Sequence, residues 1–217
     1  MNDESVLVNN EQCSAIAEIL KNFRIRDEFY KRPFISFVSD RETKFRAYFF
    51  AVAICHQTHS LIDRKNNLHG WDFIEDVVSY LVSSNSDLLN PVKLAEYSVD
   101  DLTFRMKPLF AEEHNAENCC FDDIDERAGL LIEYGKSVRD SYEGKVSTLI
   151  DESGSHLNGS GGLYSRMERI RAFSDPLRKK SSFLIKLIAD AGLLIIKDPE
   201  NYILQRKVEY APVVETT

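Results

Sequence analysis

The stretch AYFFAVAIC, residues 47–55, consists entirely of hydrophobic residues. It occupies the centre of a longer segment, 41–58, whose composition favours a helix. A helix that is apolar on every side lies inside a protein, because a surface helix carries a polar face toward water. The sequence therefore predicts that a helix over 41–58 is buried inside the fold.

Helical signals continue on both sides of this segment. Apolar residues recur at helical spacing from Cys13 to Phe23. Pro91 indicates the start of a short helix, and Ser98 with Asp101 has the spacing of a capping box. Strand-like alternation is confined to short ambiguous runs, so the predicted fold class is all-α. The longer predicted helices cover residues 13–23, 41–58, 71–82, 126–144, 163–173 and 176–195.

Length and composition describe an ordinary globular chain. The 217 residues, 43% of them hydrophobic, suit one helical domain over 1–217. Within that domain, residues of about 1–40 with 160–217 and of about 41–158 could form two lobes. The formal net charge of −8 argues against a histone-like nucleic-acid coat, since binding to phosphates uses Lys and Arg. A local basic face on an acidic body remains compatible with this charge.

The four cysteines match no zinc-binding spacing, and two of them are adjacent. The simplest interpretation is reduced thiols in a cytoplasmic protein. The sequence contains no run of about 18 apolar residues, and its acidic start does not resemble a signal peptide. We expect no membrane partner, no cofactor and a monomer.

A cationic segment lies near the end of the chain. Between Tyr164 and Lys186 it carries seven cations against two acids, Glu168 and Asp175. Three of the cations follow Pro176 at a predicted helix start, where free N–H groups favour an anion. The segment is therefore either a solvated charged face or a phosphate site. Its cations are Arg166, Arg169, Arg171, Arg178, Lys179, Lys180 and Lys186.

The end of the chain resembles the helix-hairpin-helix DNA glycosylase superfamily. The shared features are two helices, a tight turn at 174–176, a lysine in the following helix and a later polar segment. RKKSSFLIKLI, residues 178–188, is similar to the archaeal 8-oxoguanine DNA glycosylases around their Schiff-base lysine. The stretches at 70–81, 90–102 and 126–153 resemble the queuosine salvage proteins, which are nucleotide N-glycosidases. The likeness runs from about residue 45 to about 210. It implies a helical bundle of two lobes with a cleft between them.

The resemblance implies a catalytic lysine at Lys180, or at Lys179 if the register slips by one. Such a lysine attacks the anomeric carbon as a neutral amine, which requires a lowered pKa. Arg178 and the neighbouring lysine would lower it.

The family's carboxylate falls in DPENYILQR, residues 198–206, where Asn201 occupies the position of the expected aspartate. This departure puts hydrolysis in doubt. Asp198 or Glu200 could stand in after a local shift, since each lies within one helical turn. Asn201 itself could only orient a water molecule. The Gly-x-Gly of the usual hairpin is also replaced, by SDPLR.

The segment 54–72 carries polar and aromatic residues that follow the buried helix. His56 and His59 have i, i+3 spacing, but no third ligand completes a metal site, so no metal is predicted. His56 and Gln57 could simply satisfy buried polar groups near the helix end. The resemblance suggests instead that Gln57 reads a base edge while Trp71 or Tyr202 stacks on the base.

The sequence therefore predicts an N-glycosylase that removes a modified or damaged base, with DNA as its expected partner. Alternatives are a nucleotide N-glycosidase, a non-catalytic nucleobase-binding relative, and a helical protein that binds a partner through its acidic segment at 112–126. A DNA substrate would place phosphates against Arg166, Arg169, Arg171 and the turn 178–180, with the target base extruded.

Overall fold

The computed structural model describes residues 9–21, 35–196 and 213–215. The chain divides into two units, 1–32 and 33–217. In the first unit, α1 (Asn10–Lys21) confirms the predicted helix as far as it is described, and Phe23 lies outside the described residues. Ile16 and Ile19 of α1 are exposed.

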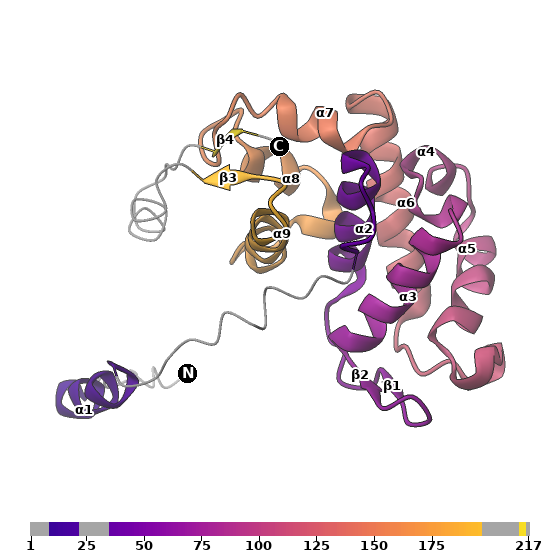
Figure 1. The fold of residues 1–217 in the computed structure, drawn as a ribbon, viewed down its shortest axis with the longest axis horizontal. Helices are drawn as coiled ribbons and strands as arrows, with labels where there is room; N and C mark the ends of the chain where they lie inside the picture. Colours follow the sequence, from indigo (N-terminus) through magenta and orange to yellow (C-terminus); the bar gives the residue numbers. More distant parts are fainter. Residues whose placement is uncertain (1–8, 22–34, 197–212, 216–217) are drawn as a thin grey trace, which may run out of the picture. The chain divides into compact units, whose positions relative to one another are not determined.

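The second unit is predominantly helical, as the sequence predicts (Figure 1). Two short antiparallel pairs, β1 with β2 and β3 with β4, are its strands within the described ranges. No helix in the described part of the chain is both long enough and apolar enough to cross a membrane. Its elements are α2 (Arg41–Ile54), β1 (Ile62–Asp63), β2 (Leu68–His69), α3 (Trp71–Ser83), η2 (Asp87–Leu89), α4 (Pro91–Leu94), α5 (Val99–Met106), η3 (Lys107–Phe110), η4 (Glu112–His114), η5 (Ala116–Asn118), α6 (Ile124–Ser141), α7 (Val146–Asp151), α8 (Leu163–Glu168), η6 (Arg171–Phe173), α9 (Lys179–Asp190), β3 (Ile195–Ile196) and β4 (Val213–Glu215).

Helix α2 lies in the interior of this unit, which confirms the prediction from its sequence. Every residue from Ala47 to Ile54 is buried. Helices α3, α6, α7 and α9 all pack against it, and Figure 1 shows α2 between α9 and the group formed by α3 and α6. The apolar stretch is buried on all sides because these four helices surround it.

The first turn of α2 is anchored by its own acids. Asp40 accepts hydrogen bonds from the backbone N–H and the hydroxyl of Thr43, as an N-cap does. Glu42 accepts from the backbone N–H groups of Val146 and Ser147, each at 2.9 Å. A single carboxylate of α2 thereby satisfies the free N–H groups at the start of α7.

Helices α4 and α6 approach each other closely at Gly135. A Cβ atom on this residue would lie 2.6 Å from the carbonyl oxygen of Pro91 and 2.8 Å from the amide of Ala95. Glycine is therefore the residue that allows the two backbones to touch. The predicted helix starts nearby are also present: α4 begins at Pro91, with Asn90 as its cap, and Ser98 accepts from the amide of Asp101 in α5.

Candidate functional site

Helix α2 ends at Ile54, four residues before its predicted end. Gln57 adopts a left-handed backbone with φ 49°, which is incompatible with a continuing helix. The backbone carbonyls released at this end are bonded by side chains from other helices. The predicted i, i+3 relation of His56 and His59 on a helix is therefore wrong, and among the described residues no group of three or more His, Cys, Asp or Glu is placed to hold a metal ion.

Two cations hold the C-terminal end of α2. Lys180 of α9 donates from Nζ to the carbonyl oxygen of Ala53 at 2.8 Å. Arg127 of α6 donates to the carbonyl oxygens of Ile54 and, at 2.7 Å, of His56. The last carbonyls of a helix lack partners within it and carry partial negative charge, so cations are favoured there.

A cavity of about 960 Å³ lies beside this end of α2, and we call it the α2–α9 cavity. The ends of α2 and η6, the turn before α9 and the first turns of α6 and α9 form its walls. Its lining residues are Cys55, His56, Glu126, Leu130, Arg171, Ala172, Ser174, Asp175, Pro176, Leu177, Lys179, Lys180 and Phe183.

Lys180 combines an amine with an environment that disfavours its charge. Burial lowers the pKa of Lys180 below its usual value, and the nearby guanidinium of Arg127 lowers it further. Cys55, Asp175 and Glu126 act in the opposite direction and limit the fall in pKa. At any given pH, a larger fraction of this amine is therefore neutral and nucleophilic than for an exposed lysine.

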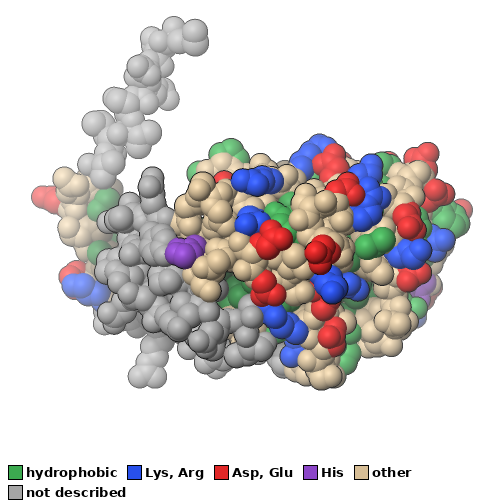
Figure 2. Space-filling model, turned by 90° about the horizontal axis from the view of Figure 1, so that it is seen from above, with side chains coloured by type: hydrophobic (Ala, Val, Ile, Leu, Met, Phe, Trp, Pro, Cys, Tyr) green, Lys and Arg blue, Asp and Glu red, His purple; other side chains and the backbone are tan. Residues whose placement is uncertain are grey.

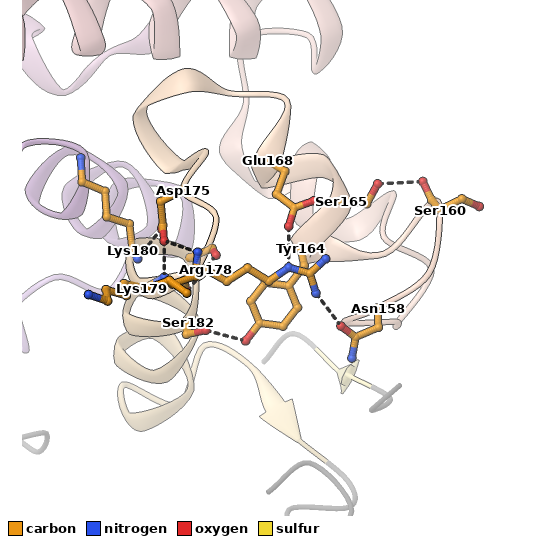
Figure 3. A network of polar contacts seen from close by, with 12 residues as sticks. Asn158, Ser160, Tyr164, Ser165, Glu168, Asp175, Arg178, Lys179, Lys180 and Ser182 are labelled. Carbon is orange, nitrogen blue, oxygen red and sulfur yellow. Dashed lines mark hydrogen bonds and ion pairs between the residues drawn. The ribbon is translucent and has the colours of Figure 1, made fainter. Parts of the chain in front are cut away.

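Asp175 occupies the anion position at the start of α9 (Figure 3). One of its carboxylate oxygens accepts from the backbone N–H groups of Leu177 and Lys179, at 3.1 and 2.9 Å. The other accepts from the N–H of Lys180 at 3.1 Å. The helix start that the sequence analysis offers to a phosphate is thus already filled by this carboxylate, which also lines the cavity.

Arg178 does not help to lower the pKa of Lys180, contrary to the expectation from the sequence. It precedes α9 with φ 53°, and Figure 3 shows its side chain extending over the ring of Tyr164, away from Lys180. There it forms an ion pair with Glu168. The left-handed backbone of Arg178 turns its guanidinium out of the cavity, and Arg127 supplies the neighbouring positive charge instead.

Most of the remaining cations of the segment are also paired. Arg166 bonds Glu152 at 2.7 Å, and Arg171 bonds Glu133 at 3.1 Å. Lys186 bonds Asp190 at 3.0 Å. Three of these partners lie outside the stretch 164–186, so its sequence alone overstates its free positive charge. Figure 2 likewise shows Lys and Arg side chains interspersed with Asp and Glu across the face that it presents.

The predicted site residues separate into three groups. His56, Arg171, Lys179 and Lys180 all line the α2–α9 cavity. The cavity lining does not include Gln57, Trp71 or Arg178. Gln57 is exposed. Trp71 begins α3, and its ring makes a T-shaped contact with the ring of Phe183, with 5.0 Å between the two centroids. Asp198, Glu200, Asn201 and Tyr202 lie outside the described residues.

Three side chains that the sequence analysis did not select are brought to this site. Phe183 supplies the aromatic wall, one turn after Lys180 on α9. Asp175 supplies a carboxylate, and an aspartate directly before proline at a helix start was the signal for it. Arg127 is completely buried, and its position among the apolar residues of α6 was a signal too, since a cation there needs partners.

A scan against protein-family models finds no match to this chain, and a search of curated proteins finds no relative at a significant level.

Proposed function

We propose that the chain is an N-glycosidase that cleaves the bond between a nucleobase and its sugar, with Lys180 as nucleophile. One observation carries the proposal: an amine with a lowered pKa lines a cavity that also contains a carboxylate and an aromatic ring. A neutral Lys180 Nζ would attack the anomeric carbon as the bond to the base breaks and the base takes up a proton. The sugar ring would then open, as the bond between the anomeric carbon and the ring oxygen breaks and that oxygen takes up the second proton of the amine, which gives an imine. Hydrolysis of the imine would return the amine.

The other lining residues fit roles in this reaction. Asp175 would stabilise the positive charge that develops on the sugar, because its carboxylate lines the same cavity as Lys180 and is held in place by the backbone N–H of that residue. Phe183 would stack on the base, a contact worth about 1–3 kcal/mol in nucleic-acid complexes. The apolar residues Leu130 and Ala172 would exclude water from the base.

Base release and covalent trapping test the proposal directly. The chain is incubated with damaged-base oligonucleotides and with modified nucleoside 5′-monophosphates, and the free base is quantified by chromatography. Borohydride then traps any imine on Lys180 for mass spectrometry. We expect Lys180→Ala to lower base release at least about 100-fold, as removal of a nucleophile does. Full activity in this variant would exclude the mechanism.

Matched variants distinguish a loss of catalysis from a loss of folding, and they identify which carboxylate takes part in the reaction. Lys186→Ala removes a lysine of the same helix that bonds Asp190 outside the cavity, and it should retain activity. Asp175→Asn should lower base release by about 10- to 100-fold if this carboxylate stabilises the sugar cation. Asp198→Ala is compared in parallel, because the resemblance assigns the acid to that stretch. The larger loss identifies the catalytic carboxylate.

The pairing of the cations favours a free nucleotide over DNA as the substrate. With Arg166, Arg171 and Arg178 bonded to acids, the segment 164–186 has few cations left to contact several phosphates. Binding is titrated with salt for both ligand classes. A logarithmic slope of about −1 or shallower indicates one phosphate, and a slope of about −3 or steeper indicates a DNA footprint. The second result would restore DNA as the substrate.

A non-catalytic nucleobase binder is the second candidate, favoured by Asn201 at the expected aspartate position. It would bind the nucleotide in the same cavity, with an affinity that Phe183→Ala lowers. It would release no base and trap no imine under any of the conditions above.

A further inference from the structure

Arg127 is a buried cation whose hydrogen bonds go to backbone carbonyls and to a histidine. Its side chain is completely buried, and the ring of Phe121 covers it at 4.0 Å from guanidinium carbon to ring centroid. Nε donates to the carbonyl of Asp122 at 2.8 Å, and Nη1 and Nη2 donate to the turn that follows α2. Such a group orders that turn, because its planar fork donates to several backbone carbonyls in fixed directions.

The contact between Arg127 and His56 fixes the state of the imidazole ring. Nη1 of Arg127 lies 3.3 Å from Nδ1 of His56. Nη1 has two hydrogens and also donates to the carbonyls of Ile54 and His56, so one of these hydrogens is shared with Nδ1. Because a guanidinium has donors only, Nδ1 is the acceptor in this shared contact and carries a lone pair. In a neutral ring the hydrogen then resides on Nε2.

We propose that Arg127 is a positioning residue that holds His56 as the neutral Nε2–H tautomer, so that the α2–α9 cavity offers a fixed N–H donor to its ligand. The identity of that ligand rests on the proposed function: the donor fits a carbonyl oxygen or an unprotonated ring nitrogen on the edge of a nucleobase. His56 would therefore discriminate bases that present an acceptor from bases that present an N–H group there.

Burial and the neighbouring cations also favour the neutral form of the His56 ring. Burial lowers its pKa to about 4, and Lys180 and Arg127 add to this effect as neighbouring cations. Two acids, Asp175 and Glu126, line the same cavity. The neighbouring thiol of Cys55 adds no negative charge, because burial raises its pKa to about 11 and it stays protonated. The ring therefore stays neutral across the physiological range, and its donor is present at every pH from about 5 to 8.

Nitrogen NMR of the histidines in the ligand-free protein tests the inference without any substrate. The chain holds five histidines, and His56→Gln identifies the signals of the ring in question. We expect a protonated Nε2, an unprotonated Nδ1 and a titration midpoint near 4. A hydrogen on Nδ1, or a cationic ring at pH 7, overturns the inference. Because no base release is measured, this outcome is independent of the proposed catalytic role of Lys180.

The variant Arg127→Lys tests whether the arginine is responsible. Lysine keeps the charge but lacks the planar fork, so we expect a mixture of both tautomers and a titration midpoint shifted upward by about one pH unit. An unchanged tautomer and midpoint would show that Arg127 does not position the ring. If the variant does not fold, NMR of the guanidinium hydrogens of Arg127 in the wild type provides the test. Slow exchange with water, together with cross-relaxation to the His56 ring, would support the contact. Rapid exchange would refute it.

A binding readout completes the test. For a base whose edge presents an acceptor, His56→Gln should retain more affinity than His56→Leu, since the amide of glutamine can still donate a hydrogen bond. We expect His56→Leu to weaken binding of this base about 10-fold and to leave an analogue that lacks the acceptor unchanged. Equal losses for both ligands would indicate a structural role alone.

Discussion

The cations that hold the end of α2, Arg127 and Lys180, have an environment opposite to that of the surface arginines Arg171 and Arg178. The guanidinium of Arg127 and the amine of Lys180 donate to backbone carbonyls, and no described hydrogen bond joins either cationic group to a carboxylate. Arg171 and Arg178 lie on the surface and are each paired with an acid. Sequence composition counts these four cations alike. Their partners distinguish them: the two cations at the end of α2 stabilise the fold and line or adjoin the proposed site, and the two surface cations neutralise acidic side chains.

Removal of the buried guanidinium should give the largest effect on stability. Arg127→Met leaves the carbonyls of Ile54, His56 and Asp122 without their donor. The bond to Ile54 is buried and the bonds to His56 and Asp122 are part-buried. An unsatisfied buried carbonyl costs about 1–3 kcal/mol, so we expect the free energy of unfolding to fall by about 3–4 kcal/mol. Urea denaturation measures this change. Arg105→Met removes an exposed arginine over Tyr97 and serves as the matched control, with a loss below about 1 kcal/mol.

The pH dependence of stability should show an effect of intermediate size from the burial of His56 beside these cations. Because the folded-state pKa of His56 is lowered from 6.5 to about 4, the folded state binds fewer protons than the unfolded state between these values. Stability should therefore fall as pH decreases from about 6.5 to about 4. Partial exposure screens the ring, so we expect this group to account for about 1 kcal/mol or less.

The difference between wild type and His56→Gln in urea denaturation at pH 7 and at pH 4.5 isolates this contribution. Wild type should lose more stability than the variant over that interval. An equal loss in both proteins would mean that the ring titrates normally in the folded state, and the contrast between buried and surface cations would then be weaker than we infer.

The surface pairs should give the smallest effect. Arg171→Met and Arg178→Met each break one exposed ion pair, and we expect losses below about 1 kcal/mol at low salt that shrink further as salt is added. The comparison fails if either variant is as destabilising as Arg127→Met. Double-mutant cycles with Glu133 and Glu168 would measure each pair separately.

Local sequence signals predicted much of the fold. The buried helix follows from the apolar run 47–55, and the starts of α4 and α5 follow from Pro91 and from Ser98 with Asp101. These features depend on neighbours within about one helical turn. The end of α2 does not, because Arg127 captures its carbonyls from more than seventy residues away. A local pattern over 41–58 therefore predicts too long a helix.

The site was predicted only in part for the same reason. Lys180 was recognised as a candidate from its own segment, and the structure places it in a cavity. Its electrostatic neighbour is Arg127, and the direction of Arg178 depends on its left-handed backbone, which neither periodicity nor composition reveals. Short strands such as β1 were missed because a two-residue pair is closed by turn contacts, here Asp63 with Asn66, more than by alternation.

The contact of Glu42 with the start of α7 has a mechanical consequence for the cavity. Helix α2 is anchored at its first turn by Glu42 and at its last turn by Lys180 and Arg127. A rod of fourteen residues, about 21 Å long and clamped at both ends, resists translation along its axis. A ligand that enters the cavity therefore meets a helix end that is held in a fixed position.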